Sequence, residues 1–248
     1  MLGNIQRVGD MSTIRPDADS DCLFSTASSQ LGYFPAAQAY ECGYSRERLS
    51  NTTRTGRFQR IHRGIYRLRD YPNYPREEVV AAWLAVGKGT AVVSHESALD
   101  LLELSDVIPY AIHLTVPRSR RNLPRLPGVK IHTTTRPFDL LDLVTRDGMR
   151  VTSPARTILD IAEYGTAPEQ VEMAIRQALS RGMVFKNQLV DGARYRSSRV
   201  QRLISEAIRR ARRRLPCVAA ARGDAGVAPV KVGAGPAALA TCGNPPSA

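Results

Sequence analysis

Cysteine is scarce in this chain of 248 residues, and no two cysteines form a C-x-x-C pair. The four residues are Cys22, Cys42, Cys217 and Cys242. Their wide spacing argues against a zinc site and against a disulfide framework. We therefore expect four isolated thiols, as in a reducing compartment, and we expect neither a metal site nor a cofactor.

Long apolar runs are also missing. No stretch approaches the roughly 18 consecutive apolar residues that a membrane-spanning helix needs. The first twenty residues carry Arg7, Asp10 and Arg15 but no apolar segment of the kind found in a signal peptide. We expect a cytoplasmic protein without a membrane partner.

Lysine is rare, with four residues. The chain nevertheless has 35 lysine and arginine residues and 23 acidic residues, which gives it a formal net charge of +12. Most of the positive charge is therefore arginine, whose planar guanidinium group suits phosphate oxygens and guanine edges. A GC-rich genome would explain the preference for arginine over lysine, but it would not explain the net charge. A polyanion is the natural partner of such a chain.

The chain is long enough for two domains. We predict a winged helix-turn-helix domain over residues 21–70 and a mixed α/β domain with basic C-terminal helices over residues 76–214. Residues 1–20 and 215–248 show little periodicity, and we expect both segments to be disordered. The predicted fold class is α+β.

The N-terminal domain begins with a predicted helix whose N-cap is Asp21. A short second helix follows Pro35 and is closed by Gly43, and a third helix is capped by Ser45 and ended by Gly56. Two short helices across a tight glycine turn are typical of a helix-turn-helix.

Residues 57–68 alternate apolar and cationic side chains, which predicts a β-hairpin, the wing, with its turn at His62-Arg63-Gly64. In the preceding helix, the helical period separates Leu49 from a polar face. Arg46 and Arg54 are candidates for guanine or phosphate contacts, and Asn51 suits adenine. We expect double-stranded DNA to contact Ser45, Arg46, Ser50, Asn51, Arg54, Arg57, Arg60, Arg63 and Arg67. The alternative is an ordinary solvated helix face in a basic protein.

The second domain contains a His95-Glu96 pair at the start of a helix, after a short strand and the predicted cap Ser94. His113 and the arginines of the following loop could converge on this pair, which would permit acid-base chemistry. We favour a structural interpretation, in which Glu96 complements the helix dipole and His95 packs against the neighbouring strand. The candidate antitoxin or nucleic-acid surface comprises His95, Glu96, Arg118, Arg120 and Arg121.

Two enzyme signatures are absent from the sequence. No lysine has an acidic residue two positions before it, so the acidic-x-Lys element of restriction-like nucleases is missing. The segment around Lys88 lacks both the leading glycine and the following Ser/Thr of a phosphate-binding loop. We expect no catalytic residue.

Several ordered motifs resemble the AbiEi family of antitoxins. The winged-helix domain of that family is similar to Gly32-Tyr33-Phe34, Gly43-Tyr44-Ser45 and Arg60-Ile61-His62-Arg63-Gly64-Ile65-Tyr66. Its second domain is similar to Ser94-His95-Glu96-Ser97-Ala98-Leu99, His113-Leu114-Thr115-Val116-Pro117 and Thr152-Ser153-Pro154-Ala155-Arg156-Thr157. The chain departs from the pattern at Thr52 and Thr53, where larger apolar residues would brace the recognition helix.

The resemblance covers about residues 21 to 210 and implies a two-domain regulator of a type IV toxin-antitoxin system. Such a protein represses its own operon by binding operator inverted repeats. It also antagonises a cognate nucleotidyltransferase toxin without forming a stable complex with it. Two alternatives stay open: an orphan regulator without a toxin, and a nucleic-acid-processing enzyme that uses His95 and Glu96.

Overall fold

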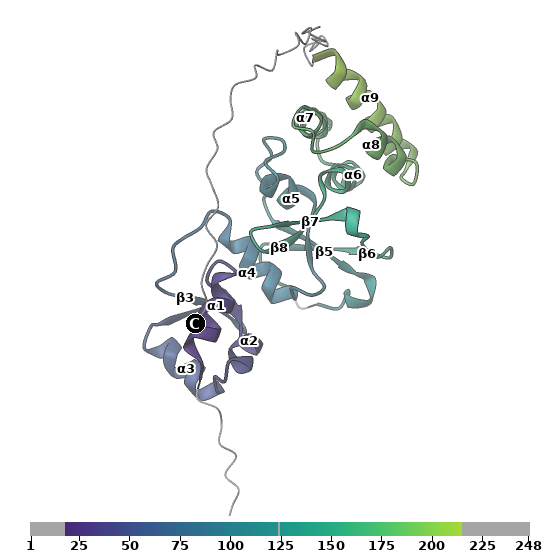
Figure 1. Cartoon of the computed structure of the whole chain (residues 1–248). Helices are drawn as coiled ribbons and strands as arrows, with labels where there is room; N and C mark the ends of the chain where they lie inside the picture. Colours follow the sequence, from purple (N-terminus) through teal and green to yellow (C-terminus); the bar gives the residue numbers. More distant parts are fainter. Residues whose placement is uncertain (1–17, 124, 215–248) are drawn as a thin grey trace, which may run out of the picture. The chain divides into compact units, whose positions relative to one another are not determined.

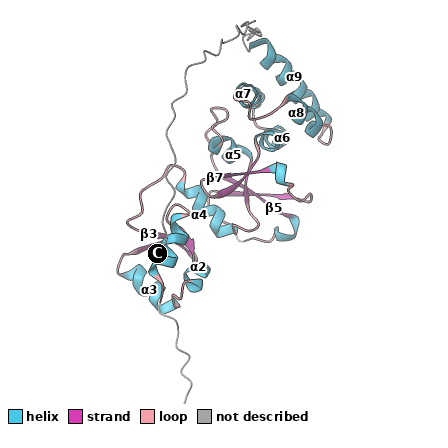
Figure 2. Ribbon diagram, viewed as in Figure 1, coloured by secondary structure: helices cyan, strands magenta, loops and turns pink. Residues whose placement is uncertain are grey.

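The computed structural model describes residues 18–123 and 125–214 of the chain. The segments predicted to be disordered therefore lie outside the described residues, apart from residues 18–20. Within those three, Asp19 is the N-cap of the first helix and accepts hydrogen bonds from two backbone N–H groups, so the predicted cap at Asp21 is wrong. Helices and strands alternate along the chain, which confirms the α+β class (Figures 1 and 2).

The N-terminal part combines three short helices with a three-stranded antiparallel sheet. Its elements are α1 (Ser20–Ser28), β1 (Tyr33–Pro35), α2 (Ala36–Glu41), α3 (Arg46–Arg54), β2 (Phe58–His62) and β3 (Ile65–Leu68). The predicted helix-turn-helix and hairpin are both present, whereas β1 was not predicted. In the sheet order β1-β3-β2, the strand β3 is central and pairs with both neighbours.

Local backbone chemistry sets the bounds of α3. The Ser45 side chain accepts a hydrogen bond from the backbone N–H of Arg48, as expected for an N-cap. Gly43 and Gly56 both have φ of 81°, in the left-handed region where a side chain would be strained. The two glycines therefore isolate α3 as a separate short helix between α2 and the hairpin.

The core of this part is aromatic. Phe34 is fully buried and contacts the ring of Phe58 at 5.1 Å and that of Tyr66 at 5.9 Å, measured between centroids. Leu49 is the residue of α3 that joins this core. Leu49 thus anchors α3 to the core, and the other faces of α3 remain open to solvent.

Cys22 on α1 and Cys42 at the end of α2 form a disulfide. The expectation of four isolated thiols is therefore wrong for this pair, while Cys217 and Cys242 lie outside the described residues. No local pattern signals this disulfide, because the pairing depends on α1 and α2 packing against each other, which brings the two Cα atoms to 5.7 Å. That separation lies in the usual range for a disulfide.

The second part contains a five-stranded mixed sheet and six α-helices among the described residues. Its strands are β4 (Val92–Val93), β5 (Ile112–Pro117), β6 (Val129–Thr134), β7 (Leu143–Arg146) and β8 (Met149–Thr152), in the order β6-β5-β4-β8-β7. Its helices are α4 (Glu77–Val86), α5 (His95–Leu101), α6 (Pro154–Tyr164), α7 (Pro168–Ser180), α8 (Lys186–Ala193) and α9 (Ser198–Arg214), with two 3₁₀ turns, η1 (Arg118–Arg120) and η2 (Leu140–Asp142).

Alternation along β5 gives the sheet two different faces. Leu114 and Val116 point to the side of α4 and join a core that also includes Tyr33 and Ile65 from the first sheet. His113 and Thr115 point to the side of α5 and α6, which lie across the sheet from α4 (Figure 1). The polar residues of β5 are therefore inside the molecule, at a place where strands usually carry apolar ones.

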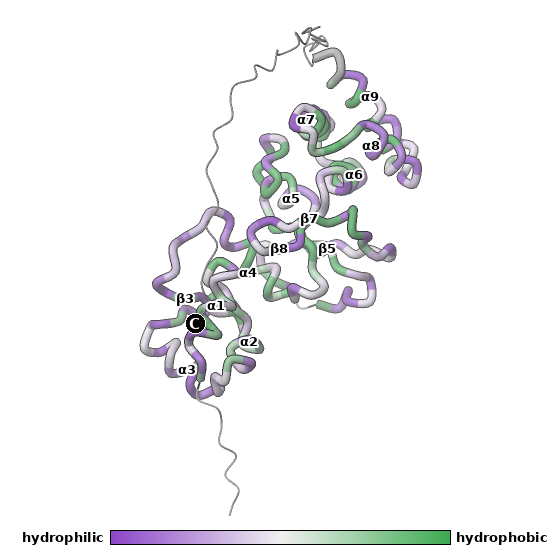
Figure 3. Tube along the Cα trace, viewed as in Figure 1, coloured by the Kyte–Doolittle hydropathy of each residue, from purple (hydrophilic) through white to green (hydrophobic). Residues whose placement is uncertain are grey.

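Helices α5 to α9 form a second apolar core. In α9 the buried residues Val200, Ile204, Ala207, Ile208 and Ala211 recur at helical spacing. The predicted basic C-terminal helices are observed as α8 and α9, and Arg199, Arg202, Arg209 and Arg210 of α9 are exposed. Hydrophilic and hydrophobic positions alternate along the described part of α9 (Figure 3). None of the helices that the structure describes is long and apolar enough to cross a membrane.

Candidate functional site

The first candidate site is a groove of about 1030 Å³ between α3 and the wing hairpin. The α3 side supplies Arg46, Ser50, Asn51 and Arg54, and the hairpin supplies Arg60 and Arg63. All six side chains are exposed. The structure therefore brings together on one surface most of the residues that the sequence singled out for DNA contact.

Three of the predicted contact residues do not line this groove. Ser45 is occupied as the N-cap of α3, and Arg57 is exposed just before β2 but outside the groove. The groove also contains residues that the sequence did not single out, including Tyr40, Glu47 and Tyr66. Tyr40 is 47% exposed and adds an aromatic surface beside the cationic one.

Arg67 is the third, and its prediction as a DNA contact is wrong. The residue is 5% exposed, and its guanidinium donates hydrogen bonds to the backbone oxygens of Tyr71 and Pro72 and to the side chains of Asn73 and Glu77. Strand β3 is central, and its second face is covered by the segment that leads into α4. Arg67 therefore fastens the base of the wing to that segment.

Thr52 and Thr53, which depart from the family pattern, donate hydrogen bonds from their hydroxyl groups to backbone carbonyls of the same helix. Thr52 Oγ1 donates to the carbonyl of Arg48 at 2.7 Å, and Thr53 Oγ1 donates to that of Leu49 at 2.8 Å. Such bonds to the preceding turn leave the helix intact. The missing apolar brace is supplied by Leu49, which is 2% exposed.

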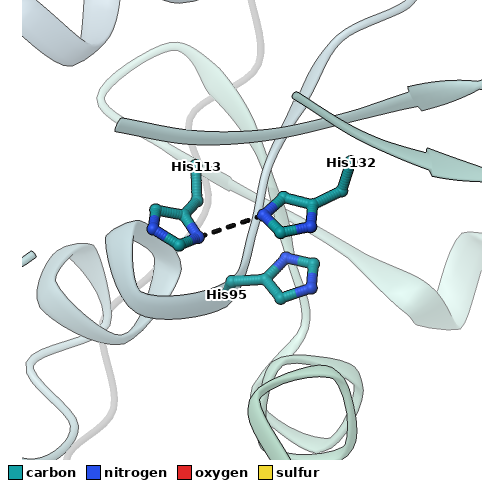
Figure 4. A group of neighbouring side chains, drawn as sticks. All are labelled: His95, His113 and His132. Carbon is teal, nitrogen blue, oxygen red and sulfur yellow. Dashed lines mark hydrogen bonds between the residues drawn. The ribbon is translucent and has the colours of Figure 1, made fainter. Parts of the chain in front are cut away.

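The second candidate site is a cluster of three histidines from three elements: His95 at the start of α5, His113 on β5 and His132 on β6 (Figure 4). The Nε2 atom of His132 and the Nδ1 atom of His113 are 3.1 Å apart and share a hydrogen bond. The ring of His95 stacks on that of His132, with centroids 3.6 Å apart. The ring of Tyr164 meets all three edge-on.

Burial keeps these imidazoles neutral. It lowers the pKa of His95 to about 2 and that of His132 to about 4, and the neighbouring rings act in the same direction. Burial also lowers the pKa of His113, although Glu96 opposes the shift. A protonated ring would lose hydration in this interior, and this desolvation disfavours the charged form.

The start of α5 differs in detail from the sequence prediction. Ser94 occupies the N-cap position, but its side chain does not cap the helix; its Oγ lies 2.7 Å from Thr115 Oγ1 and 2.9 Å from His95 Nδ1. His95 has φ of 53°, a conformation that non-glycine residues seldom adopt. Glu96 accepts a hydrogen bond from Thr166 at 2.9 Å. The side chains of His95 and Glu96 are thus both held by buried hydrogen bonds.

A cavity of about 360 Å³ opens beside the histidine cluster and is lined by His95, His132, Tyr164 and the threonines after His132. Its wall includes an ion-pair network centred on Asp160 of α6. Asp160 accepts from Arg156 at 2.9 Å and from Arg196 at 2.6 Å. The cavity therefore combines neutral imidazoles with cationic side chains.

The basic loop predicted beside His95 lies elsewhere. Arg118, Arg120 and Arg121 are exposed on and after η1, and none of the three lines the cavity of the histidine cluster. Arg118 lines a separate cavity together with Phe138 and Arg150. The convergence of His95 with His113 is thus observed, whereas its convergence with the arginines is not.

His132 was missed by the sequence analysis. The residue occupies a polar stretch of β6 and pairs in register with Thr115, which places it beside His113 on the same face of the sheet. Because β5 and β6 are parallel and joined by a long loop, the sequence offers no periodic signal for this contact. The available signal was the small number of histidines, four in the whole chain.

Comparison with known proteins decides the nature of the N-terminal part. Residues 23–69 match the family described as "Transcriptional regulator, AbiEi antitoxin". This segment is similar to the regulator domain of the AbiEi family. The matched range begins in α1 and ends just after β3, so it contains the groove between α3 and the hairpin, with its arginines. A search of curated protein sequences found no match.

A similar fold over most of the chain occurs in a solved structure. The chain is similar to the structure titled "Crystal structure of RV2827C protein from Mycobacterium tuberculosis", with a TM-score of 0.51 and 14% sequence identity. The similarity covers 76% of this chain and 75% of that one. At this level of identity the likeness concerns the fold alone.

Proposed function

We propose that the protein is a DNA-binding autorepressor that inserts α3 into the major groove and places its wing on the flanking backbone. The observation that carries this proposal is the single groove that joins exposed arginines of α3 to those of the hairpin. The match of residues 23–69 to a family of transcriptional regulators supports it.

The two sides of the groove are suited to different DNA contacts: α3 to base edges and the hairpin to phosphates. A helix presents side chains to base edges, and Arg46, Asn51 and Arg54 carry the groups that read guanine or adenine. Arg60 and Arg63 stand on a hairpin that reaches phosphates, which adds affinity without reading sequence. The net charge of +12 adds long-range attraction to any duplex.

We expect Arg46→Ala and Arg54→Ala each to weaken binding to the DNA upstream of the protein's own gene by about 1–3 kcal/mol. Arg60→Ala should weaken binding to all sequences alike and reduce the slope of log affinity against log salt by about one. Gel-shift titrations at several salt concentrations, with specific and scrambled duplexes, measure both effects.

Arg202→Ala is the matched control, since it removes one exposed arginine from α9, outside the groove. An equal loss of affinity in Arg202→Ala would show that net charge alone drives binding. Unchanged affinity in Arg46→Ala, Arg54→Ala and Arg60→Ala together would exclude the docking arrangement.

We further propose that the protein antagonises a nucleotidyltransferase toxin encoded beside it. The word antitoxin in the description of the matched family supports the antagonism of a toxin. Co-expression of that neighbouring gene should arrest growth, and the full-length protein should restore it. The double variant Arg46→Ala/Arg54→Ala should still restore growth when both genes are driven by foreign promoters, because antagonism does not use the operator. Failure of the wild-type protein to restore growth would favour an orphan regulator.

A further inference from the structure

We infer that His95, His113 and His132 form a binding site for one divalent transition-metal ion of the zinc type. One ring nitrogen from each histidine lies within 4.8 Å of those of the other two. Three imidazoles are a common protein ligand set for zinc, which then keeps a fourth coordination position for water or a substrate group. The inference goes beyond the proposed regulatory role and does not depend on it.

The spacing of the nitrogens suits a shared ion. Zinc binds imidazole nitrogen at about 2.0–2.1 Å, so two nitrogens on one tetrahedral ion lie about 3.3 Å apart. His113 Nδ1 and His132 Nε2 are 3.1 Å apart, close to that value. The ring of His95 stacks on that of His132 at an interplanar angle of 14°, so His95 has to rotate out of this stack before one of its nitrogens can bind the same ion (Figure 4).

Two features around His95 support a binding site. His95 is held at a φ of 53°, and residues in sparsely populated backbone conformations gather at functional sites. The Ser94 hydroxyl beside His95 Nδ1 resembles the outer partners that orient metal-binding imidazoles.

The site is open to an ion and to a further ligand. His95 and His132 line the cavity of about 360 Å³, so an ion can enter and its fourth position would face that cavity. Arg156 and Arg196 stand in the cavity wall together with the carboxylates of Asp160 and Glu163, so the charges of the wall balance and the fourth position suits a water molecule.

The test is metal binding by the full-length protein after chelator treatment and alkylation of free thiols, so that Cys217 and Cys242 cannot contribute. Titration with Zn²⁺ in a calorimeter should give one ion per chain. Co²⁺ should produce the visible absorption of a site with nitrogen ligands. Wild-type protein that binds neither ion overturns the inference, and this readout needs no variant.

Variants then locate the ligands. His132→Gln, at the half-buried position, and His113→Gln should each weaken Zn²⁺ affinity at least tenfold, whereas His62→Gln in the wing should not change it. Circular dichroism verifies that each variant is folded, and a rise in melting temperature on adding Zn²⁺ should appear in the wild type and in His62→Gln only. Full affinity in the His113→Gln/His132→Gln double variant would place the ion elsewhere and overturn the inference.

Discussion

Replacing Asp160 by alanine should lower the free energy of unfolding by about 3–5 kcal/mol, because it removes the shared partner of two partly buried arginines. The Asp160 carboxylate is 6% exposed, and the side chains of Arg156 and Arg196 are 12% and 23% exposed. Arg156 keeps a second contact with Asp142 at 3.3 Å, so we expect the lower half of the range. Urea unfolding at neutral pH measures the loss.

Asp191→Ala is the control for this prediction. Asp191 pairs with Arg194 at 3.5 Å, and both side chains are largely exposed. Solvent-exposed ion pairs contribute about 0–1 kcal/mol, so this variant should remain close to the wild type. Equal stabilities of Asp160→Ala and Asp191→Ala would mean that the network on α6 does not stabilise the fold.

Acidification below pH 6.5 should destabilise the metal-free protein steeply. The folded state holds the pKa of His95 at about 2 and that of His132 at about 4, both below the ordinary value of 6.5. The unfolded chain therefore binds more protons, and stability that is complete above pH 6.5 is lost as the pH falls towards 4. Each such histidine contributes a slope of at most about 1.4 kcal/mol per pH unit.

Burial sets the sign of this effect, and the charged groups that face the cluster reinforce or oppose it. Arg156 and Arg196 disfavour a charge on His95, and Lys130 disfavours one on His132, while Glu96 favours one on His113. Urea unfolding in the presence of a chelator, from pH 7 to 4.5, gives the slope. His132→Gln should make it shallower, and an identical slope in that variant would rule out His132 as a contributor.

Much of the first domain could be predicted because its signals are local. The Ser45 cap, the glycines that bound α3 and the alternation of the hairpin each act within a few residues. Strand β1 could not be predicted, since three residues ending in proline carry no periodic pattern and gain their structure from pairing with β3.

What the sequence could not predict depends on contacts between distant segments. The orientation of Arg67 follows from the central place of β3 and from the segment that covers it. The Cys22–Cys42 disulfide follows from the packing of α1 against α2. The histidine cluster follows from the register of β5 with β6 and from the start of α5. Each of these features requires the tertiary fold to be known first.

Tyr33 and Ile65 belong to the same apolar core as α4, although both lie in the three-stranded sheet. A chain cut after Asp70 would expose these two side chains to water and deprive Arg67 of its partner Glu77. A fragment that ends at Asp70 should therefore be less stable and more prone to aggregation than the uncut chain. The groove of the first sheet and the histidine cluster of the second sheet therefore have to be studied in one uncut polypeptide.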